Sequence, residues 1–517
     1  MKSLVRSTIL LLLGSAGLVL SLYTSTVYAQ EAADPILYSQ QAIEFTNASV
    51  GATRPGLTLP GTATAFDLGS VLDNPASAAL FQQGFFDLSL AASNTNEEAF
   101  YLGGTQTDNQ LKGSLSSLGF VVALPTRAGA LNFGGSYVQT GTFNRAYSVM
   151  GFNSDHTITD QFKIPGNSYE GIAFETYAID YGDVDQTYLE SIFRVGFTPE
   201  QYPGIQQEGE ILQEGMAGEW NAFVATEFQR NLFIGASIGV TNGEKTYKRT
   251  FLELDLANSY NEDFIDTNND GIGNTDVDNI LLQDDFRSEY SGLSARVGII
   301  YQMGRALRFG ASYKLPSTLE VTERYDSVIR TTMDNADFFQ SSLSGEFDYK
   351  IKQPSTLSVG LSIGSLNGFE FAFGADYTPL SNTEINYSGL ETFRDERLDN
   401  EYIKTVYEDV LDLRAGVKYT APVGVTIFGS ALYQAPRFVG SSQERLAFGF
   451  GGDVPVNRTL SVFVNTRLTS FEEEYAVYRD KPPRTLNGSE LQINPAIATT
   501  NLDVLSFDMQ VGIKARF

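Results

Sequence analysis

The stretch Phe507-Asp508-Met509-Gln510-Val511-Gly512-Ile513-Lys514-Ala515-Arg516-Phe517 decides the fold class of this chain of 517 residues. Apolar side chains occupy every second position, and Asp, Gln, Gly, Lys and Arg stand between them. Successive side chains of a β-strand point to opposite faces, so the stretch predicts a strand with one apolar and one polar face. The alternation runs to the last residue and stops on an aromatic side chain, which is typical of the final strand of an outer-membrane barrel.

The same alternation recurs upstream in many places. Apolar faces with polar partners are found at 220–228, 293–301, 307–313, 369–377, 411–419 and 460–468. A soluble β-sandwich shows this pattern with its apolar face inward, and a membrane barrel shows it with the apolar face outward. Periodicity alone therefore leaves both classes open.

The connections between these stretches distinguish the two classes, because short and long ones alternate. Tight turns are expected at 125–129, 229–231, 304–306, 365–368, 421–424 and 454–457, and long polar loops at 95–111, 149–217, 251–288, 328–345, 388–406 and 476–502, with a shorter one near 437–442. Short turns at one rim and long loops at the other are the plan of outer-membrane barrels. We therefore predict an all-β fold, a transmembrane antiparallel barrel of about 14 strands over residues 85–517.

The first 29 residues read as a signal peptide. Lys2 and Arg6 precede an apolar run over 9–22, and Val27-Tyr28-Ala29 is a small-residue cleavage site. A single membrane anchor is the alternative, but the run is short and contains Gly14 and Gly17. The mature chain is expected to begin near Gln30, in the outer membrane of a Gram-negative bacterium.

Residues 30–84 do not alternate, and they are rich in Gly, Thr, Ala and Pro. A disordered tail is the simple interpretation. The scattered apolar residues Ile43, Phe45, Leu57, Leu59, Phe66, Leu68 and Leu72 instead favour a compact object, and a barrel of this size has a lumen wide enough to hold one. We expect this segment to be an N-terminal hatch that plugs the lumen.

Composition limits the remaining possibilities. The chain has no Cys, so disulfides cannot stabilise it. Asp and Glu number 62 against 35 Lys and Arg, a net charge of −27, which argues against nucleic acid as a partner. This balance suits acidic extracellular loops that divalent cations bridge to lipopolysaccharide.

Asp73-Asn74-Pro75-Ala76-Ser77-Ala78-Ala79-Leu80 directly precedes the first expected strand. It resembles the Asn-Pro-Ala-Gly-Leu-Ala-like stretch of the FadL/TodX family of outer-membrane transporters for long-chain fatty acids and other hydrophobic compounds. Ser77 stands where that family usually has Gly. The layout is similar over nearly the whole mature chain, but only Asn74, Pro75 and Ala76, the hatch motif, are distinctive.

The resemblance implies passive, hatch-gated uptake of a fatty-acid-like molecule, with a lateral exit through a gap made by a kink in the third strand. The candidates for the kink are Gly134 and Gly135, with Gly141 as second choice, because glycine weakens strand pairing and permits bulges. Close packing of the hatch against the wall is the alternative reason for these glycines.

The long loop 149–217 offers candidates for contact with a hydrophobic ligand. Phe152, Phe162, Leu189, Ile192 and Phe193 are the apolar residues chosen there. A loop cluster that packs on itself explains them equally well.

Residues 266–274 resemble a calcium loop. Asp266, Asn268 and Asp270 stand at alternate positions, Gly271 permits a sharp turn, and the Ile272 carbonyl and Asn274 complete the expected ligands. Val277 occupies the position where an EF-hand has Glu, so we expect a structural calcium site in an extracellular loop rather than a sensor. A solvated Asn/Asp turn is the alternative.

We expect no enzymatic activity and no required cofactor. His156 is the only histidine, and the chain carries neither a Walker loop nor a dinucleotide-binding fingerprint. The expected partners are a hydrophobic small molecule, outer-membrane lipid and lipopolysaccharide, and the barrel-assembly machinery that reads the last strand. A surface-protein shuttle of the same family and a diffusion porin are the alternative functions.

Overall fold

A computed structural model describes residues 37–517 except 50, 52–53, 55–58, 127–128, 164–168, 183–184, 196–201, 269, 388–392, 440, 442, 479–483, 487–489 and 493–497. The predicted signal peptide lies outside the described residues.

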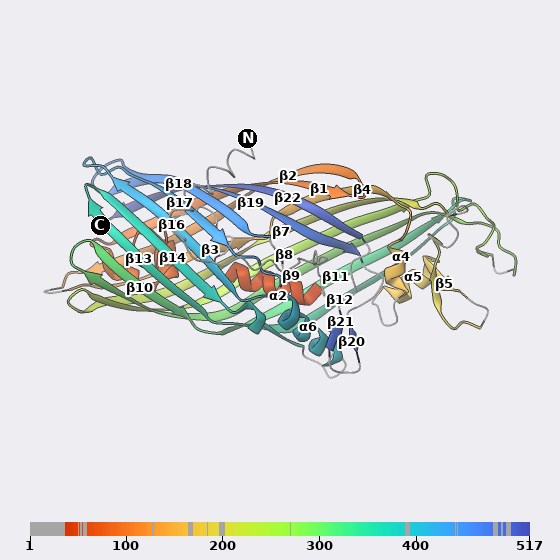
Figure 1. Ribbon diagram of the computed structural model, residues 1–517, viewed down its shortest axis with the longest axis horizontal. Coiled ribbons are helices and arrows are strands. Elements are labelled where there is room, and N and C mark those ends of the chain that lie inside the picture. Colours follow the sequence, from red (N-terminus) through yellow and green to blue (C-terminus); the bar gives the residue numbers. More distant parts are fainter. Residues whose placement is uncertain are drawn as a thin grey trace, which may run out of the picture. The chain divides into compact units, whose positions relative to one another are not determined.

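The described chain forms one closed antiparallel barrel of 14 strands, as predicted (Figure 1). In chain order the wall consists of β1 (Phe85–Tyr101), β2 (Gly104–Leu124), β3 (Leu131–Thr142) continued by β4 (Arg145–Asn153), β7 (Ile205–Gln229), β8 (Leu232–Leu254), β9 (Val277–Met303), β10 (Leu307–Lys314) continued by β11 (Ser317–Met333), β12 (Phe338–Gln353) continued by β13 (Thr356–Leu366), β14 (Phe369–Thr378) with β15 (Glu384–Tyr387), β16 (Val410–Thr420), β17 (Thr426–Gln434), β18 (Arg445–Pro455), β19 (Leu460–Tyr478) and β22 (Ala498–Arg516). The ring closes where β22 pairs with β1, from Phe85↔Arg516 to Phe100↔Asn501.

Two of the polar stretches predicted to be loops are strand instead. β1 and β2 continue through 95–111 to a turn at Leu102 and Gly103, and β11 and β12 continue through most of 328–345. These strands run beyond the apolar band, where both faces meet water and polar residues replace the alternating pattern. Polarity therefore marks the edge of the membrane there, and the strands extend past it.

The outer face of the wall carries the apolar side chains. Leu293, Ile238 and Phe373 are 69%, 63% and 47% exposed on it. The polar residues that alternate with the outward side chains point inward and form ion pairs, such as the buried pair Arg296–Glu219 and the partly buried pair Arg414–Asp376. An apolar exterior around a polar interior is the arrangement of a barrel embedded in an outer membrane.

The N-terminal segment, defined here as the described part of residues 37–84, lies inside the barrel (Figure 1). It contains the helices α2 (Leu37–Ser49) and α3 (Leu68–Asp73) and the short helix η1 (Pro75–Leu80). Its groups bond to inward side chains from distant strands: Ser312 donates to the Asp73 carbonyl, and Lys514 donates to the Phe66 carbonyl. Two wall glycines make room for it, since a Cβ on Gly298 would lie 1.8 Å from Asn74 Oδ1 and one on Gly310 would lie 1.9 Å from the Thr62 carbonyl.

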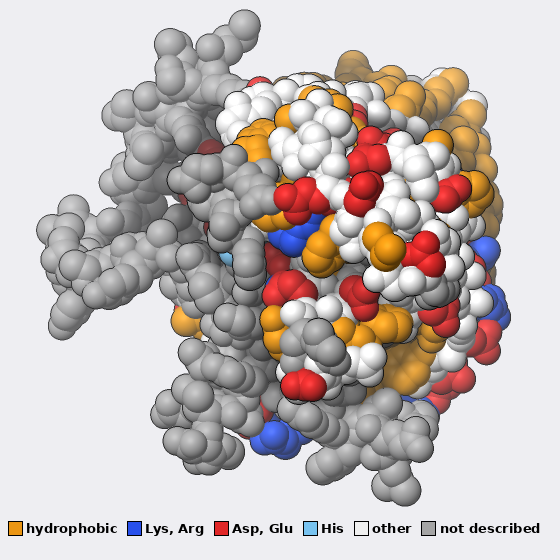
Figure 2. Space-filling model, turned by 90° about the vertical axis from the view of Figure 1, so that its right-hand side faces the viewer, with side chains coloured by type: hydrophobic (Ala, Val, Ile, Leu, Met, Phe, Trp, Pro, Cys, Tyr) orange, Lys and Arg blue, Asp and Glu red, His pale blue; other side chains and the backbone are white. Residues whose placement is uncertain are grey.

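The long loops gather at the end of the barrel opposite the short turns. They carry α4 (Thr159–Phe162), α5 (Glu170–Glu175), α6 (Phe393–Val406) and the small hairpins β5 (Ile179–Tyr181) with β6 (Leu189–Ser191) and β20 (Arg484–Leu486) with β21 (Glu490–Gln492), whereas η2 (Leu380–Asn382) lies in the wall between β14 and β15. Among the described residues, no helix combines the length and the apolar character needed to cross a membrane. Figure 2 shows that acidic side chains outnumber basic ones over the described part of this face.

Candidate functional site

The third barrel strand is interrupted, and we call the stretch of wall that lacks a backbone ladder beside β2 the window. β2 pairs with β3 only from Ser117↔Val138 to Leu124↔Leu131. Above that point β3 and β4 pair with β7 alone, and the register shifts between Gln139 and Gly141. The upper half of β2, residues 104–116, therefore bonds through its backbone to β1 only.

The two glycines proposed for a kink lie below this window. Gly134 and Gly135 are paired on both sides, with Val121 and Phe120 on β2 and with Phe223 and Ala222 on β7. The interruption occupies residues 139–144 instead and includes Gly141, the second choice. A Cβ on Gly134 would lie 2.1 Å from the Phe120 carbonyl, so this glycine serves close strand packing.

Side chains close the window in place of a backbone ladder. We call these contacts the polar bridge: Ser114 Oγ donates to Gln139 Oε1 at 2.8 Å, Gln110 Nε2 donates to the Gln213 carbonyl at 3.3 Å, and Lys112 pairs with Glu214 at 2.6 Å. Both partners of the Lys112–Glu214 pair are about 40% exposed. At its upper end the window is bounded by the β1–β2 turn, because a Cβ on Gly104 would lie 2.3 Å from the Met150 carbonyl.

A cavity of about 150 Å³ lies directly inside the window, beneath α2. Its lining combines α2, the interruption and the upper ends of strands that are far apart in the sequence. The lining residues are Gln40, Ile43, Glu44, Asn47, Ala48, Thr95, Thr142, Phe143, Asn144, Arg145, Gln213, Tyr407, Gln434, Arg437, Phe438, Arg445, Arg467, Thr469, Phe471, Glu473, Val504, Ser506 and Asp508. Gln213 belongs both to this lining and to the polar bridge, so the bridge separates the cavity from the outside of the barrel.

The cavity is amphipathic. Apolar side chains from α2, the interruption and β19 form one part of it, including Ile43, Phe143 and Phe471. Four arginines and three carboxylates also line it, which leaves one formal positive charge in excess among the lining side chains. Such a lining suits a molecule with an apolar body and a negatively charged end.

Arg445 is the cation of the cavity with the weakest ion pairing. Glu473 lies 2.8 Å from Arg145 but 3.8 Å from Arg445. Arg145 also bonds Glu97 at 2.8 Å. The Arg445 guanidinium instead stacks over the Phe471 ring at 4.0 Å. An arginine held against an aromatic face without a close carboxylate keeps its donors free for an anionic group.

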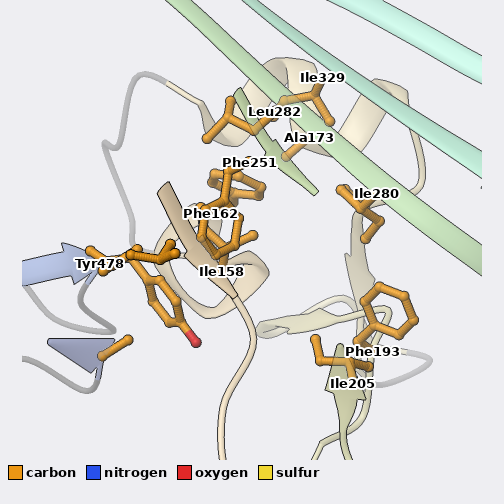
Figure 3. Packing of buried hydrophobic residues seen from close by; sticks show 14 of the residues in the cluster. Ile158, Phe162, Ala173, Phe193, Ile205, Phe251, Ile280, Leu282, Ile329 and Tyr478 are labelled. Atoms are coloured by element: carbon orange, nitrogen blue, oxygen red, sulfur yellow. The ribbon is translucent and has the colours of Figure 1, made fainter. Parts of the chain in front are cut away.

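The predicted ligand residues lie elsewhere. Phe162, Ile192 and Phe193 are at most 3% exposed in a cluster that joins the 154–204 region to the upper ends of the strands, and Figure 3 shows Phe162 pointing into it with Ile158 and Phe251. Leu189 is packed against the same cluster, and Phe152 is 51% exposed. None of the five lines the cavity beneath α2, so their contact with a ligand stays a prediction.

The hatch motif lies near the end of the N-terminal segment, at the start of η1. Asn74 Oδ1 accepts from the Ala76 amide at 3.0 Å, and its Nδ2 donates to the Thr62 carbonyl at 2.6 Å. Pro75 occupies the first turn of η1, where a missing amide proton costs nothing. The motif therefore fixes the local conformation of the segment and brings Asn74 into close contact with the wall at Gly298.

The calcium-like loop is exposed, and its oxygens face its own backbone. Asp266 Oδ1 and Oδ2 accept from the amides of Asp270 and Gly271 at 3.2 and 2.7 Å, and Asp270 Oδ1 accepts from the Ile272 amide at 2.9 Å. Asn274 Oδ1 accepts from the Thr267 amide at 2.9 Å. No group of three or more His, Cys, Asp or Glu suited to a metal occurs in the described part of the chain. The loop has the geometry of Asx turns, and a calcium site there stays a prediction.

Comparison with known proteins bears on the fold. No model of a known protein family matches the sequence, and no curated protein matches it. A FadL homologue of Pseudomonas aeruginosa has a similar structure, with a TM-score of 0.52 and 11% identity over 91% of this chain and 98% of that one. The toluene transporter TodX of Pseudomonas putida aligns with a TM-score of 0.48 and 12% identity over 89% of this chain and 97% of that one.

The likeness to the FadL homologue confirms the resemblance to FadL-type barrels at the level of the fold. The apolar outer face is that of a barrel which spans a membrane.

Proposed function

We propose that the protein takes up a hydrophobic small molecule of the fatty-acid type by passive diffusion. The molecule would bind in the cavity beneath α2 and leave sideways through the window in the third strand. The position of the cavity, directly inside an interruption of the wall, is the observation that carries this proposal. The names of the similar structures, a FadL homologue and a toluene transporter, agree with cargo of this kind.

A lateral route is physically sensible for such cargo. Each CH₂ group exposed to water costs about 0.8 kcal/mol relative to burial, so a long alkyl chain crosses a water-filled pore at a large cost. A path from an amphipathic cavity to the lipid avoids this exposure. The four arginines of the cavity favour an acidic end group on the molecule.

The N-terminal segment would act as the hatch in this scheme. It occupies the lumen and bonds to the wall through residues such as Asp73, Lys314 and Arg467. A filled lumen disfavours the diffusion porin, whose lumen is an open polar channel. Planar-bilayer recordings on the purified protein should therefore show little ion conductance.

Cross-linking the window tests the proposal directly. Since the chain has no cysteine, the pair Ser114→Cys and Gln139→Cys can be joined by a cleavable bifunctional reagent without side reactions. Uptake of a fluorescent fatty acid by cells should fall at least about tenfold when the pair is joined and return after reduction.

The control pair is Asp326→Cys with Ser344→Cys, which face each other across the continuous β11–β12 ladder. Joining it should leave uptake unchanged. Unchanged uptake after residues 114 and 139 are cross-linked would refute lateral exit. If the unmodified protein did not bind the fatty acid, the proposed cargo would be refuted.

A further inference from the structure

Three neighbouring wall strands break at the same level, and each break contains a proline. β10 gives way to β11 at Leu315-Pro316, β12 to β13 at Pro354-Ser355, and β14 to β15 across 379–383. We call these positions the proline crease. Proline lacks the amide that a ladder requires, so it interrupts the pairing of a central strand.

The strand registers show the same interruption. β9 pairs with β10 up to Arg296↔Lys314 and resumes with β11 at Gly292↔Leu319. Between the second and third of these strands, β13 pairs with β14 up to Leu357↔Tyr377. The pairing resumes between β12 and β15 at Lys352↔Glu384. The continuous ladders therefore stop across three adjacent strands, although the Leu315 amide still donates to the Ala295 carbonyl at 3.0 Å and the Asn382 amide to the Pro379 carbonyl at 3.0 Å.

An external groove of about 970 Å³ follows the crease. Val240 and Leu293 form its apolar side, and they are 44% and 69% exposed. The other side carries hydroxyl, amide and charged groups: Ser291, Ser317, Thr318, Glu320, Lys352, Ser355, Asn382 and Glu384. The groove therefore joins the apolar outer face of the barrel to its polar upper part.

The groove lies at the outer boundary of the membrane. Leu293 stands eleven residues along β9 from the turn at Gly304. With a rise of ~3.3 Å per residue and a tilt of ~40°, this spacing gives a height of about 28 Å, close to the ~25 Å apolar band of such barrels. Farther along β9 from the short turn, the side chains of Glu289 and Arg287 point outward and form an ion pair at 3.0 Å.

Backbone groups outside a continuous ladder are disfavoured against hydrocarbon, so the crease favours a polar partner at this depth. The cations near the groove are already engaged: Lys352 pairs with Glu384 and Lys350 with Glu320, both at 2.7 Å. Carboxylates outnumber ammonium groups in the lining. A bare phosphate therefore finds no free cation there, whereas an uncharged, hydroxyl-rich head finds many hydrogen-bond partners.

We propose that the proline crease binds an outer-leaflet lipid through an uncharged sugar of its head group, with an acyl chain over Val240 and Leu293. The site also reaches the interior. Gln353 lines the groove, and its Nε2 donates to Ser49 Oγ at 3.0 Å and to the Phe45 carbonyl at 3.4 Å at the end of α2. A lipid in the groove thus contacts the residue that holds α2 over the cavity.

Alkyl compounds that share a chain and differ in their head test the chemistry. The full-length protein is purified in an oxyethylene detergent and saturated with a fatty acid, which occupies the cavity beneath α2. It is then titrated with dodecyl maltoside or with dodecyl phosphate, and adducts are counted by native mass spectrometry. The maltoside should bind at concentrations at least about tenfold lower than the phosphate. Equal binding of the two, or tighter binding of the phosphate, would overturn the assignment.

Thr318→Trp places an indole in the groove and should abolish the maltoside preference. Ser342→Trp is the matched control. Ser342 is exposed on the outer face of β12, the strand that pairs with the β11 strand of Thr318, and it does not line the groove. Heat-modified migration on a gel shows that each barrel is folded. Retention of the preference in folded Thr318→Trp would refute the location.

The two proposals can fail separately. Binding of a fluorescent fatty acid to Thr318→Trp should stay within about twofold of the unmodified value, because the cavity beneath α2 is a different site. If the unmodified protein did not bind the fluorescent fatty acid, the transport function would be refuted, and the maltoside result would still stand.

Discussion

Arg445 is the residue on which the nature of the cargo depends. It stacks on Phe471 and has only Glu473, at 3.8 Å, as a carboxylate neighbour among the described ion pairs. Arg445→Gln should weaken binding of a fluorescent fatty acid about tenfold, or ~1.4 kcal/mol, because one charge-assisted hydrogen bond is lost. Binding of the alcohol with the same chain should not change.

Arg324→Gln is the control for this titration, since Arg324 is paired with Glu346 on the outer surface, far from the cavity lining. Equal loss of the acid and the alcohol in Arg445→Gln would mean that the arginine only shapes the cavity.

Glu253 gives the extracellular loops a dependence on pH. Burial raises the pKa of this carboxyl from 4.5 to about 7, although Thr157, Gln207 and the Ile158 amide donate to it. A raised pKa means that the fold favours the neutral form, so its stabilisation is complete below pH 4.5 and is lost as the pH rises through about 7.

Protection factors, which correct hydrogen exchange for the intrinsic effect of pH on amides, should therefore be larger at pH 5 than at pH 8.5 in the described part of the 154–204 region. Glu253→Gln should remove most of this difference, whereas Glu210→Gln, at an exposed position of β7, should preserve it. An unchanged pH dependence in Glu253→Gln would assign the effect to other carboxyls.

At the level of single residues, the hatch motif could be predicted from the sequence, and the cavity lining could not. Asn74 could be selected because its neighbours form a distinctive motif, and the structure explains it as the cap of η1. The cavity lining could not be selected, because it unites α2, the interruption and the ends of several strands. Phe162 and Phe193 were chosen for their apolar character, which a packed core and a pocket share.

The elements were largely predictable, because strands that face lipid and lumen must alternate. The strand count and the short turns are confirmed, and the errors occur where strands leave the membrane and the pattern fades. The proline crease was visible in the sequence, since Pro316, Pro354 and Pro379 fall within predicted strands. The alternating pattern alone did not reveal the interruption of β3, because residues 139–144 contain only one glycine and no proline. Only the family resemblance pointed to a kink in this strand, with Gly141 as the second choice.

The contact between the N-terminal segment and β9 yields a prediction for these two elements. Gly298→Ala should displace the segment, because the new Cβ would collide with Asn74 Oδ1, and ion conductance in planar bilayers should rise. Gly113→Ala is the control, since its Cβ would meet only the Ala91 carbonyl at 3.8 Å. An unchanged conductance in folded Gly298→Ala would show that the segment does not depend on this contact.

For the whole molecule, the single tryptophan reports whether the barrel is embedded in lipid. Trp220 is 51% exposed on the outer face and lies 5.0 Å from the Tyr137 ring. Its fluorescence in reconstituted vesicles should be strongly quenched by lipids with brominated chains and weakly by aqueous iodide, because aromatic side chains form the girdle of such barrels. Strong iodide quenching without bromine quenching would contradict the membrane assignment.

The closing pair of strands has a consequence for how the chain folds. β1 and β22 are the first and last strands of the wall, so the ladder between them joins residues of very high sequence separation. Contacts of this kind slow folding, because the loop entropy of nearly the entire chain is lost before they form. Until the final strand docks, two unpaired edges stay open to other chains, and folding must be guarded against aggregation until that last contact is made.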